Sequence, residues 1–193
     1  MGGMIDIKIT PNKNQDKNTT SHKFKQDLVE FFHGKELESC LEIGTNRGYS
    51  TLILSQLFGW VTTLEINKEN IEFAKEVCKE RKNIEFLQHD VYNDKWVSKL
   101  HPNYDVVFID CAHDYESVKQ DYNNACDLEP KYIVFDDYGL PEENPAVKEF
   151  VDELLKDTDY WNGIPIGMWE GTELRSGRPL RAYEGMILYE CAE

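Results

Sequence analysis

Three aspartates follow two apolar segments that have the length of β-strands. Asp110 comes directly after Asp105–Ile109, and Asp136 and Asp137 come directly after Tyr132–Phe135. Neighbouring parallel strands end at the same edge of a sheet, so we expect these carboxylates to lie close together. Converging carboxylates repel one another unless a cation lies among them, and oxygen ligands favour Mg²⁺, Mn²⁺ or Ca²⁺ over zinc. The sequence therefore predicts a divalent metal site formed by Asp110, Asp136 and Asp137.

A glycine-containing loop follows the first strand-like segment and precedes a helix. Gly44 and Gly48 let the backbone turn tightly and approach a ligand, and the helix N-terminus offers free N–H groups. A dinucleotide-binding loop would read G-x-G-x-x-G, whereas this loop reads G-x-x-x-G after an acid. Glycines at such a turn are also compatible with a purely structural role. The residues that we expect to contact a cofactor here are Glu42, Gly44, Thr45, Asn46, Gly48, Tyr49 and Ser50.

Two further acids lie at the ends of the next two strand-like segments. Glu65 follows Val61–Leu64, where a carboxylate can accept hydrogen bonds from both ribose hydroxyls of an adenosine. Asp90 follows Ile84–Leu87, where it can accept a hydrogen bond from an adenine amino group, and Val91 can pack against the ring. Because both acids accompany the glycine loop, the sequence predicts a cofactor that contains adenosine.

The pattern Glu42-x-Gly44-x-x-x-Gly48, then Glu65, then Asp90, resembles the class I S-adenosylmethionine-dependent methyltransferases. The resemblance implies that Glu42 and the two glycines hold the methionine end of S-adenosylmethionine. It further implies that Glu65 holds the ribose and that Asp90 contacts the adenine. In members of this family without a metal, an acid at the position of Asp110 binds the amino group of the cofactor, so the resemblance also implies a cofactor contact for Asp110.

The segment around Asp110 resembles a narrower group, the metal-dependent small-molecule O-methyltransferases. The branch that methylates sugar hydroxyls in antibiotic biosynthesis shows Ile-Asp-Gly-x-His-x-Tyr-Glu, followed later by Asp-Asp-Tyr. Residues 109–116 read Ile-Asp-Cys-Ala-His-Asp-Tyr-Glu, so Cys111 replaces the glycine, and this change can alter the backbone turn beside Asp110. A bound divalent cation would lower the pKa of a substrate hydroxyl, and the resulting alkoxide or phenolate would attack the methyl group of the cofactor. We expect Asp110 and His113 to be the catalytic residues, with His113 as the base.

Each of these assignments has an alternative. His113 can be an exposed loop residue, Asp136 and Asp137 can form a turn, and Asp110 can contact only the cofactor. At the level of function, the alternatives are a nicotinamide-dependent dehydrogenase, an aminopropyltransferase of the spermidine synthase kind and a catalytically silent cofactor-binding scaffold. The missing middle glycine disfavours the dehydrogenase.

Strand-like segments alternate with amphipathic segments along most of the chain. The strand-like segments are Cys40–Ile43, Val61–Leu64, Ile84–Leu87, Asp105–Ile109, Tyr132–Phe135 and Gly185–Tyr189. The helix-like segments are Tyr49–Phe58, Lys68–Lys79, Asp94–Leu100 and Tyr115–Leu128, with further helices after Ser21 and from Asn144-Pro145. This alternation predicts an α/β fold: a Rossmann-like, doubly wound, mostly parallel seven-stranded sheet with helices on both faces and an antiparallel last strand. We expect a long loop, 168–181, between the two closing strands.

Composition restricts the partners of the protein. The chain has 193 residues and a formal net charge of −15 at pH 7, which disfavours nucleic acid and membrane surfaces. We expect a flexible N-terminal segment over 1–20 and one domain over 21–193. The five cysteines include no C-x-x-C pair, and no apolar stretch resembles a signal peptide, so we expect a cytoplasmic protein. The expected substrate is a small hydroxylated molecule, either a sugar or a catechol-like ring, and a homodimer is left open.

Overall fold

The alternating segments form a seven-stranded sheet in a computed structural model of the chain. The structure describes residues 7, 19–93, 100, 103–139, 145–157, 160–171 and 180–190. The strands are β1 (Ser39–Ile43), β2 (Trp60–Glu65), β3 (Ile84–Gln88), β4 (Val106–Ile109), β5 (Tyr132–Phe135), β6 (Trp161–Gly171) and β7 (Leu180–Glu190). The helices are α1 (His22–Phe32), α2 (Tyr49–Leu57), α3 (Lys68–Val77), α4 (Tyr115–Cys126) and α5 (Pro145–Asp157).

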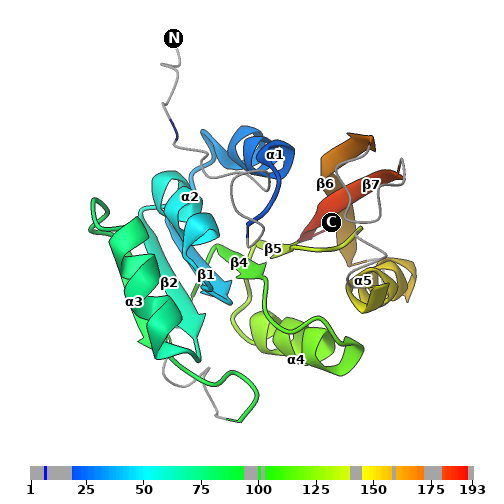
Figure 1. Ribbon diagram of the computed structural model, residues 1–193. Coiled ribbons are helices and arrows are strands. Elements are labelled where there is room, and N and C mark those ends of the chain that lie inside the picture. Colours follow the sequence, from blue (N-terminus) through cyan, green and yellow to red (C-terminus); the bar gives the residue numbers. More distant parts are fainter. Residues whose placement is uncertain are drawn as a thin grey trace.

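The order of the strands identifies the place where a ligand is expected. The order is β3-β2-β1-β4-β5-β7-β6 (Figure 1). Strands β1 to β5 are parallel, whereas β7 is antiparallel to both β5 and β6. The chain runs outward from β1 to β3 and then crosses to β4, so the strand order reverses between β1 and β4. Ligands of open α/β sheets bind outside the carboxyl ends of the strands at such a reversal. The predicted doubly wound, mostly parallel sheet with an antiparallel last strand is confirmed.

Strand β4 shows why helices cover both faces of the sheet. Val107 and Ile109 belong to one buried cluster, together with residues of α4 and α5. Val106 and Phe108 belong to a second cluster, together with residues of α1 and α2. Successive side chains of a strand point to opposite faces, so an apolar strand needs a helix layer on each side. Helices α1 and α2 pack together, and so do α4 and α5 (Figure 1). Among the described helices, none combines the length and the apolar composition that crossing a membrane requires.

Side-chain caps mark the starts of two helices that the sequence predicts. At the start of α1, Ser21 Oγ accepts a hydrogen bond from the backbone N–H of Phe24 at 3.1 Å. At the start of α4, Asp114 accepts a hydrogen bond from the N–H of Ser117, also at 3.1 Å. Such caps satisfy N–H groups that have no partner within the helix. The expected helix Asp94–Leu100 falls mostly on residues outside the described part of the chain, as does the greater part of the expected flexible segment 1–20.

The closing hairpin is longer than the sequence predicts. Strands β6 and β7 remain paired as far as Gly171 and Leu180, so the expected loop 168–181 is wrong at both ends. Pro165 and Gly167 in the sequence favoured an early end of the strand. However, β6 is an edge strand, where proline is tolerated. Gly167 has a φ of +70°, and its N–H donates to Asp27 Oδ2 of α1 at 2.8 Å. Residues 172–179, including Arg175 and Arg178, lie outside the described residues.

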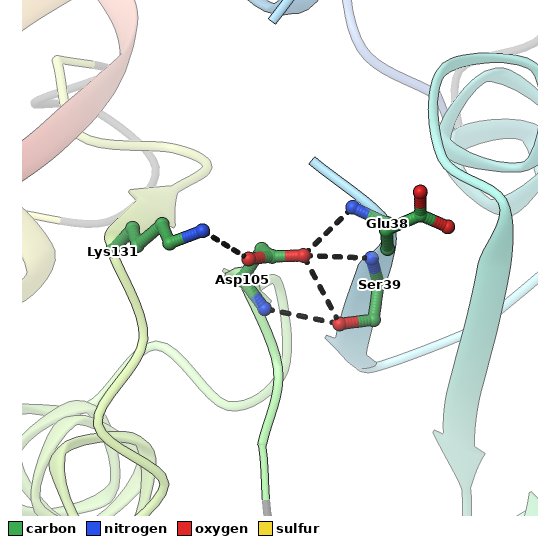
Figure 2. Close-up of polar contacts among 4 residues, drawn as sticks. All are labelled: Glu38, Ser39, Asp105 and Lys131. Carbon is green, nitrogen blue, oxygen red and sulfur yellow. Dashed lines mark hydrogen bonds and ion pairs between the residues drawn. The ribbon is translucent and has the colours of Figure 1, made fainter. Parts of the chain in front are cut away.

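Asp105 joins three strands at the edge of the sheet opposite the candidate site. Its Oδ2 accepts hydrogen bonds from the backbone N–H groups of Glu38 at 2.7 Å and Ser39 at 3.1 Å (Figure 2). Its Oδ1 accepts a hydrogen bond from Lys131 Nζ at 2.7 Å. Burial opposes ionisation of Asp105, but the bonds from Lys131 and from the two N–H groups outweigh it and hold the pKa below its ordinary value. The carboxylate therefore ties the starts of β1 and β5 to β4.

We expect Asp105→Asn to lower the free energy of unfolding at pH 7 by about 1.5–3 kcal/mol, because charge-assisted hydrogen bonds are lost. A lowered native pKa stabilises the fold above the ordinary pKa of about 3.9, and this contribution disappears as the pH falls through the native pKa. The difference from the wild type should therefore shrink below about pH 4. Urea unfolding at pH 7 and in acid measures this difference in the free energy of unfolding, and Glu80→Gln, at an exposed position, is the control. A pH-independent difference would contradict the assigned role of the charge.

Candidate active site

The strand register brings the predicted site residues to one edge of the sheet. Ile43 of β1 pairs with Leu64 of β2 and with Ile109 of β4, and Ile109 pairs with Phe135 of β5. The residues that directly follow these four strand positions therefore emerge at the same level. They are Gly44, Glu65, Asp110 and Asp136. This edge includes the reversal between β1 and β4, where an open α/β sheet binds its ligand.

The glycine loop packs directly against the chain that leaves β4. Gly44 has a φ of +102°, and a Cβ at this position would lie 1.8 Å from the carbonyl oxygen of Asp110. Gly48 has a φ of +73°, and a Cβ there would lie 2.7 Å from Cβ of Ala74 in α3. Gly48 is also the N-cap of α2 and provides no side-chain cap, so Tyr49 and Ser50 begin a helix whose first N–H groups can serve a ligand. Both glycines are required by close packing as well as by backbone conformation.

Glu42 lies beneath the glycine loop and not on its surface. The side chain is fully buried, and its Oε2 accepts hydrogen bonds from Oγ1 of Thr51 at 2.5 Å and of Thr63 at 2.6 Å. Thr63 Oγ1 in turn lies 2.5 Å from Oγ1 of Thr45. Burial raises the pKa of Glu42 to about 8, against the lowering effect of the two threonines. Its Oε1 is also buried and has no hydrogen-bond partner among the described residues.

Glu65 is fixed by the backbone at the end of β2. One carboxylate oxygen accepts the N–H of Asn46 at 2.8 Å, and the other accepts the N–H of Asn67 at 2.8 Å. Asn46 has a φ of +45°, in the left-handed region that asparagine tolerates better than most residues. The next residue, Ile66, is a large apolar side chain that is 60% exposed. Ile66 was not among the cofactor-contacting residues predicted from the sequence, although its position directly after Glu65 was a usable signal.

The turn after β3 holds Asp90 at the surface and Val91 in the core. Asp90 accepts hydrogen bonds from Asn93 Nδ2 at 2.7 Å and from the N–H of Tyr92 at 3.0 Å, and these bonds lower its pKa. Val91 is buried in the cluster beneath α4, so little of it is available to pack on a ring. Asp90 therefore lies where the sequence predicts it, whereas Val91 is turned inward.

Two aspartates and a histidine converge where β4 and β5 end. One ligand atom each of Asp110, His113 and Asp137 lies within 4.8 Å of the others. His113 Nε2 lies 3.2 Å from Asp137 Oδ2 and 3.7 Å from Asp110 Oδ1. The side chains are partly open to solvent, with exposed fractions of 33% for His113, 26% for Asp110 and 16% for Asp137. Two carboxylates and an imidazole at these separations can bind a divalent cation.

Asp136, predicted from the sequence to bind a metal together with Asp110 and Asp137, is not part of the converging group. The side chain is buried, and its Oδ1 accepts the backbone N–H of Asp137 at 2.9 Å. Among the described residues, the converging group includes His113 in its place. Asp137 has a φ of +55°, in the left-handed region that aspartate adopts more readily than most residues. Cys111 has no positive φ, so the replacement of glycine in the related pattern causes no backbone strain.

A family model for a methyltransferase domain matches residues 41–138 of the chain. This range includes the glycine loop, Glu65, Asp90 and the converging acids, and it covers more than half of the chain. Among curated proteins, no sequence matches this one.

Solved structures show the same fold at low sequence identity. An O-methyltransferase from Bacillus cereus in complex with SAH is 20% identical, with 98% of this chain and 84% of that chain covered and a TM-score of 0.62. An rRNA methylase from Streptococcus thermophilus is 10% identical, with coverages of 87% and 94% and a TM-score of 0.60. A tRNA methyltransferase from Aquifex aeolicus is 17% identical, with coverages of 92% and 72% and a TM-score of 0.60. The fold is thus shared by methyltransferases whose substrates differ widely. The chain belongs to the matching methyltransferase family and is a class I S-adenosylmethionine-dependent methyltransferase.

Proposed function

We propose that the protein transfers the methyl group of S-adenosylmethionine to a hydroxyl of a small molecule, a sugar or a catechol-like ring, with the help of a divalent cation. The observation that supports this proposal is the convergence of Asp110, His113 and Asp137 beside the glycine loop. The net charge of −15 argues against a polyanionic substrate such as RNA.

The residues at the carboxyl edge suit the parts of the cofactor. We propose that the glycine loop, with Glu42 beneath it, binds the methionine end. Glu65 would accept hydrogen bonds from the ribose hydroxyls, and the exposed Ile66 would cover one face of the adenine. Asp90 would accept a hydrogen bond from the adenine amino group. These positions follow the ends of β1, β2 and β3 in the order in which the strands lie.

The converging acids suit a cation that prefers oxygen ligands, and we propose Asp110, Asp136 and Asp137 as its binding residues. When bound, such a cation would lower the pKa of a substrate hydroxyl. His113 would take the hydroxyl proton at Nε2, and the carboxylates of Asp137 and Asp110 would stabilise the imidazolium that forms. In a second arrangement, favoured by the observed group, His113 itself replaces Asp136 as a ligand.

The first experiment is a calorimetric titration with S-adenosylmethionine, S-adenosylhomocysteine and NAD, each with and without Mg²⁺. We expect both adenosyl ligands to bind and NAD not to bind. Methyl transfer from labelled S-adenosylmethionine to a panel of sugars, catechols, polyamines and nucleic acids, with EDTA as the control, then tests the O-methyl chemistry. Transfer that is insensitive to EDTA would refute the metal, and transfer only to polyamines or nucleic acid would refute the substrate class.

Glu65→Ala is expected to weaken S-adenosylhomocysteine binding by roughly 10- to 150-fold, because hydrogen bonds from ribose to a charged acceptor are worth about 1.5–3 kcal/mol. Titration calorimetry measures the effect. Glu72→Ala removes an exposed acid of α3 and is the matched control. Equal affinities of the two variants would show that Glu65 does not hold the ribose.

A further inference from the structure

The hydroxyl of Tyr92 links three separate segments of the chain. It donates a hydrogen bond to Asp121 Oδ2 in α4 at 3.0 Å. It also accepts the backbone N–H of Ala112 at 3.2 Å. Burial raises the pKa of Tyr92, so the hydroxyl keeps the one proton that it donates. A tyrosine hydroxyl can donate once and accept at the same time, and both capacities are used here.

Each end of this link lies beside a residue of the proposed site. On one side, the N–H of Tyr92 donates to Asp90 Oδ1, the proposed acceptor for the adenine amino group. On the other side, Ala112 lies between Asp110 and His113 in the chain. A short turn therefore connects the adenine position to the loop that bears the catalytic residues. Gln120 Nε2 in α4 also donates to the carbonyl of Val91 at 3.4 Å, which fixes this turn to the same helix as Asp121.

Asp121 carries a buried carboxyl group that is only partly hydrogen-bonded. Its side chain is fully buried in α4, and its Oδ1 has no hydrogen-bond partner among the described residues. Burial raises its pKa to about 7, against the lowering effect of the Tyr92 hydroxyl. A buried carboxyl with an unsatisfied oxygen lowers stability, so a purely structural role would be served better by an apolar residue.

We propose that Tyr92 and Asp121 are positioning residues that transmit cofactor binding at the Asp90 turn to the Asp110–His113 loop, and thereby raise the affinity of that loop for a divalent cation. The inference rests on the proposed function, because it needs both a bound cofactor and a metal. The coupling is a free energy shared between two sites, so the metal must raise the affinity for the cofactor by the same factor.

The test compares Tyr92→Phe, which removes only the hydroxyl, with the wild type. In the wild type, S-adenosylhomocysteine should slow hydrogen exchange of the Ala112 amide and tighten Mn²⁺ binding by roughly 5-fold or more. In Tyr92→Phe, both effects should be absent, while the affinity for S-adenosylhomocysteine alone should change by less than about 3-fold. Tyr104→Phe is the matched control, because Tyr104 also donates a buried hydroxyl bond, to Thr62 Oγ1 at 2.9 Å.

Two variants of Asp121 show whether a loss of coupling has a cause other than a folding defect. Asp121→Asn keeps an oxygen that can accept from Tyr92, so it should retain the coupling, whereas Asp121→Leu should lose it. The inference is overturned if Tyr92→Phe keeps the wild-type coupling, or if the wild type binds both ligands without coupling. Failure of the proposed function would look different, because the wild type would then bind no S-adenosylhomocysteine or no Mn²⁺ at all.

Discussion

Replacing Asp137 by asparagine is expected to weaken Mn²⁺ binding by at least roughly 100-fold, since even the loss of an outer partner of a metal ligand costs about 10- to 100-fold. The rate of methyl transfer should fall as well, because less of the protein carries the metal. Asparagine keeps the shape of the side chain and tolerates the positive φ of this position, so the fold should be unaffected. Titration of Mn²⁺ measures the affinity, and thermal unfolding together with the affinity for S-adenosylhomocysteine shows that the remainder of the site is intact.

The same titration identifies the third ligand. If the ligands are the three aspartates, Asp136→Asn should weaken Mn²⁺ binding nearly as much as Asp137→Asn does. The observed group predicts instead that His113→Gln weakens Mn²⁺ binding more than Asp136→Asn does. If His113 acts only as the base, its loss should lower the rate of methyl transfer and leave Mn²⁺ affinity unchanged. Asp127→Asn, at the exposed end of α4, is the control. Unchanged Mn²⁺ affinity in Asp137→Asn would refute the metal site.

Gly44→Ala is expected to disrupt both halves of the site. The new Cβ would lie 1.8 Å from the carbonyl oxygen of Asp110, so one of the two loops must move. The positive φ of Gly44 adds a backbone cost of about 1–2 kcal/mol for a residue with a side chain. We therefore expect the free energy of unfolding to fall by roughly 2–4 kcal/mol, and the affinities for S-adenosylhomocysteine and Mn²⁺ to fall together. Urea unfolding and titration calorimetry measure the two effects.

Gly34 provides a matched control for this variant. Gly34 also has a positive φ, +78°, but a Cβ at this position would meet no atom within 4 Å. Gly34→Ala therefore measures the cost of backbone conformation alone, which should be about 1–2 kcal/mol without any effect on ligand binding. If Gly44→Ala lowered the free energy of unfolding and the ligand affinities no more than Gly34→Ala does, the contact between the glycine loop and Asp110 would contribute nothing to stability or binding.

Much of the fold could be predicted from the sequence because its signals are local. The strand segments are short apolar runs with polar ends, and β1, β4 and β5 appear within one or two residues of the predicted bounds. Ser21 and Asp114 are caps that act over three residues. Alternation of strands with helices predicts a parallel sheet by general rules of chain connection, and a parallel sheet places the strand ends together. The presence of Gly44, Glu65 and Asp110 at one edge follows from these signals alone.

The orientations of several side chains at this edge depended on distant parts of the chain. Glu42 turns under the loop because Thr51 of α2 and Thr63 of β2 meet it there. Strand β6 continues past Pro165 because it lies at the edge of the sheet, and this edge position is set by the order of all seven strands and not by the local sequence. His113 joins Asp110 and Asp137 because of how two loops pack. The sequence by itself therefore determined which residue types reach the edge of the sheet. Only the tertiary structure decided which of them face one another, because those contacts join segments far apart in the chain.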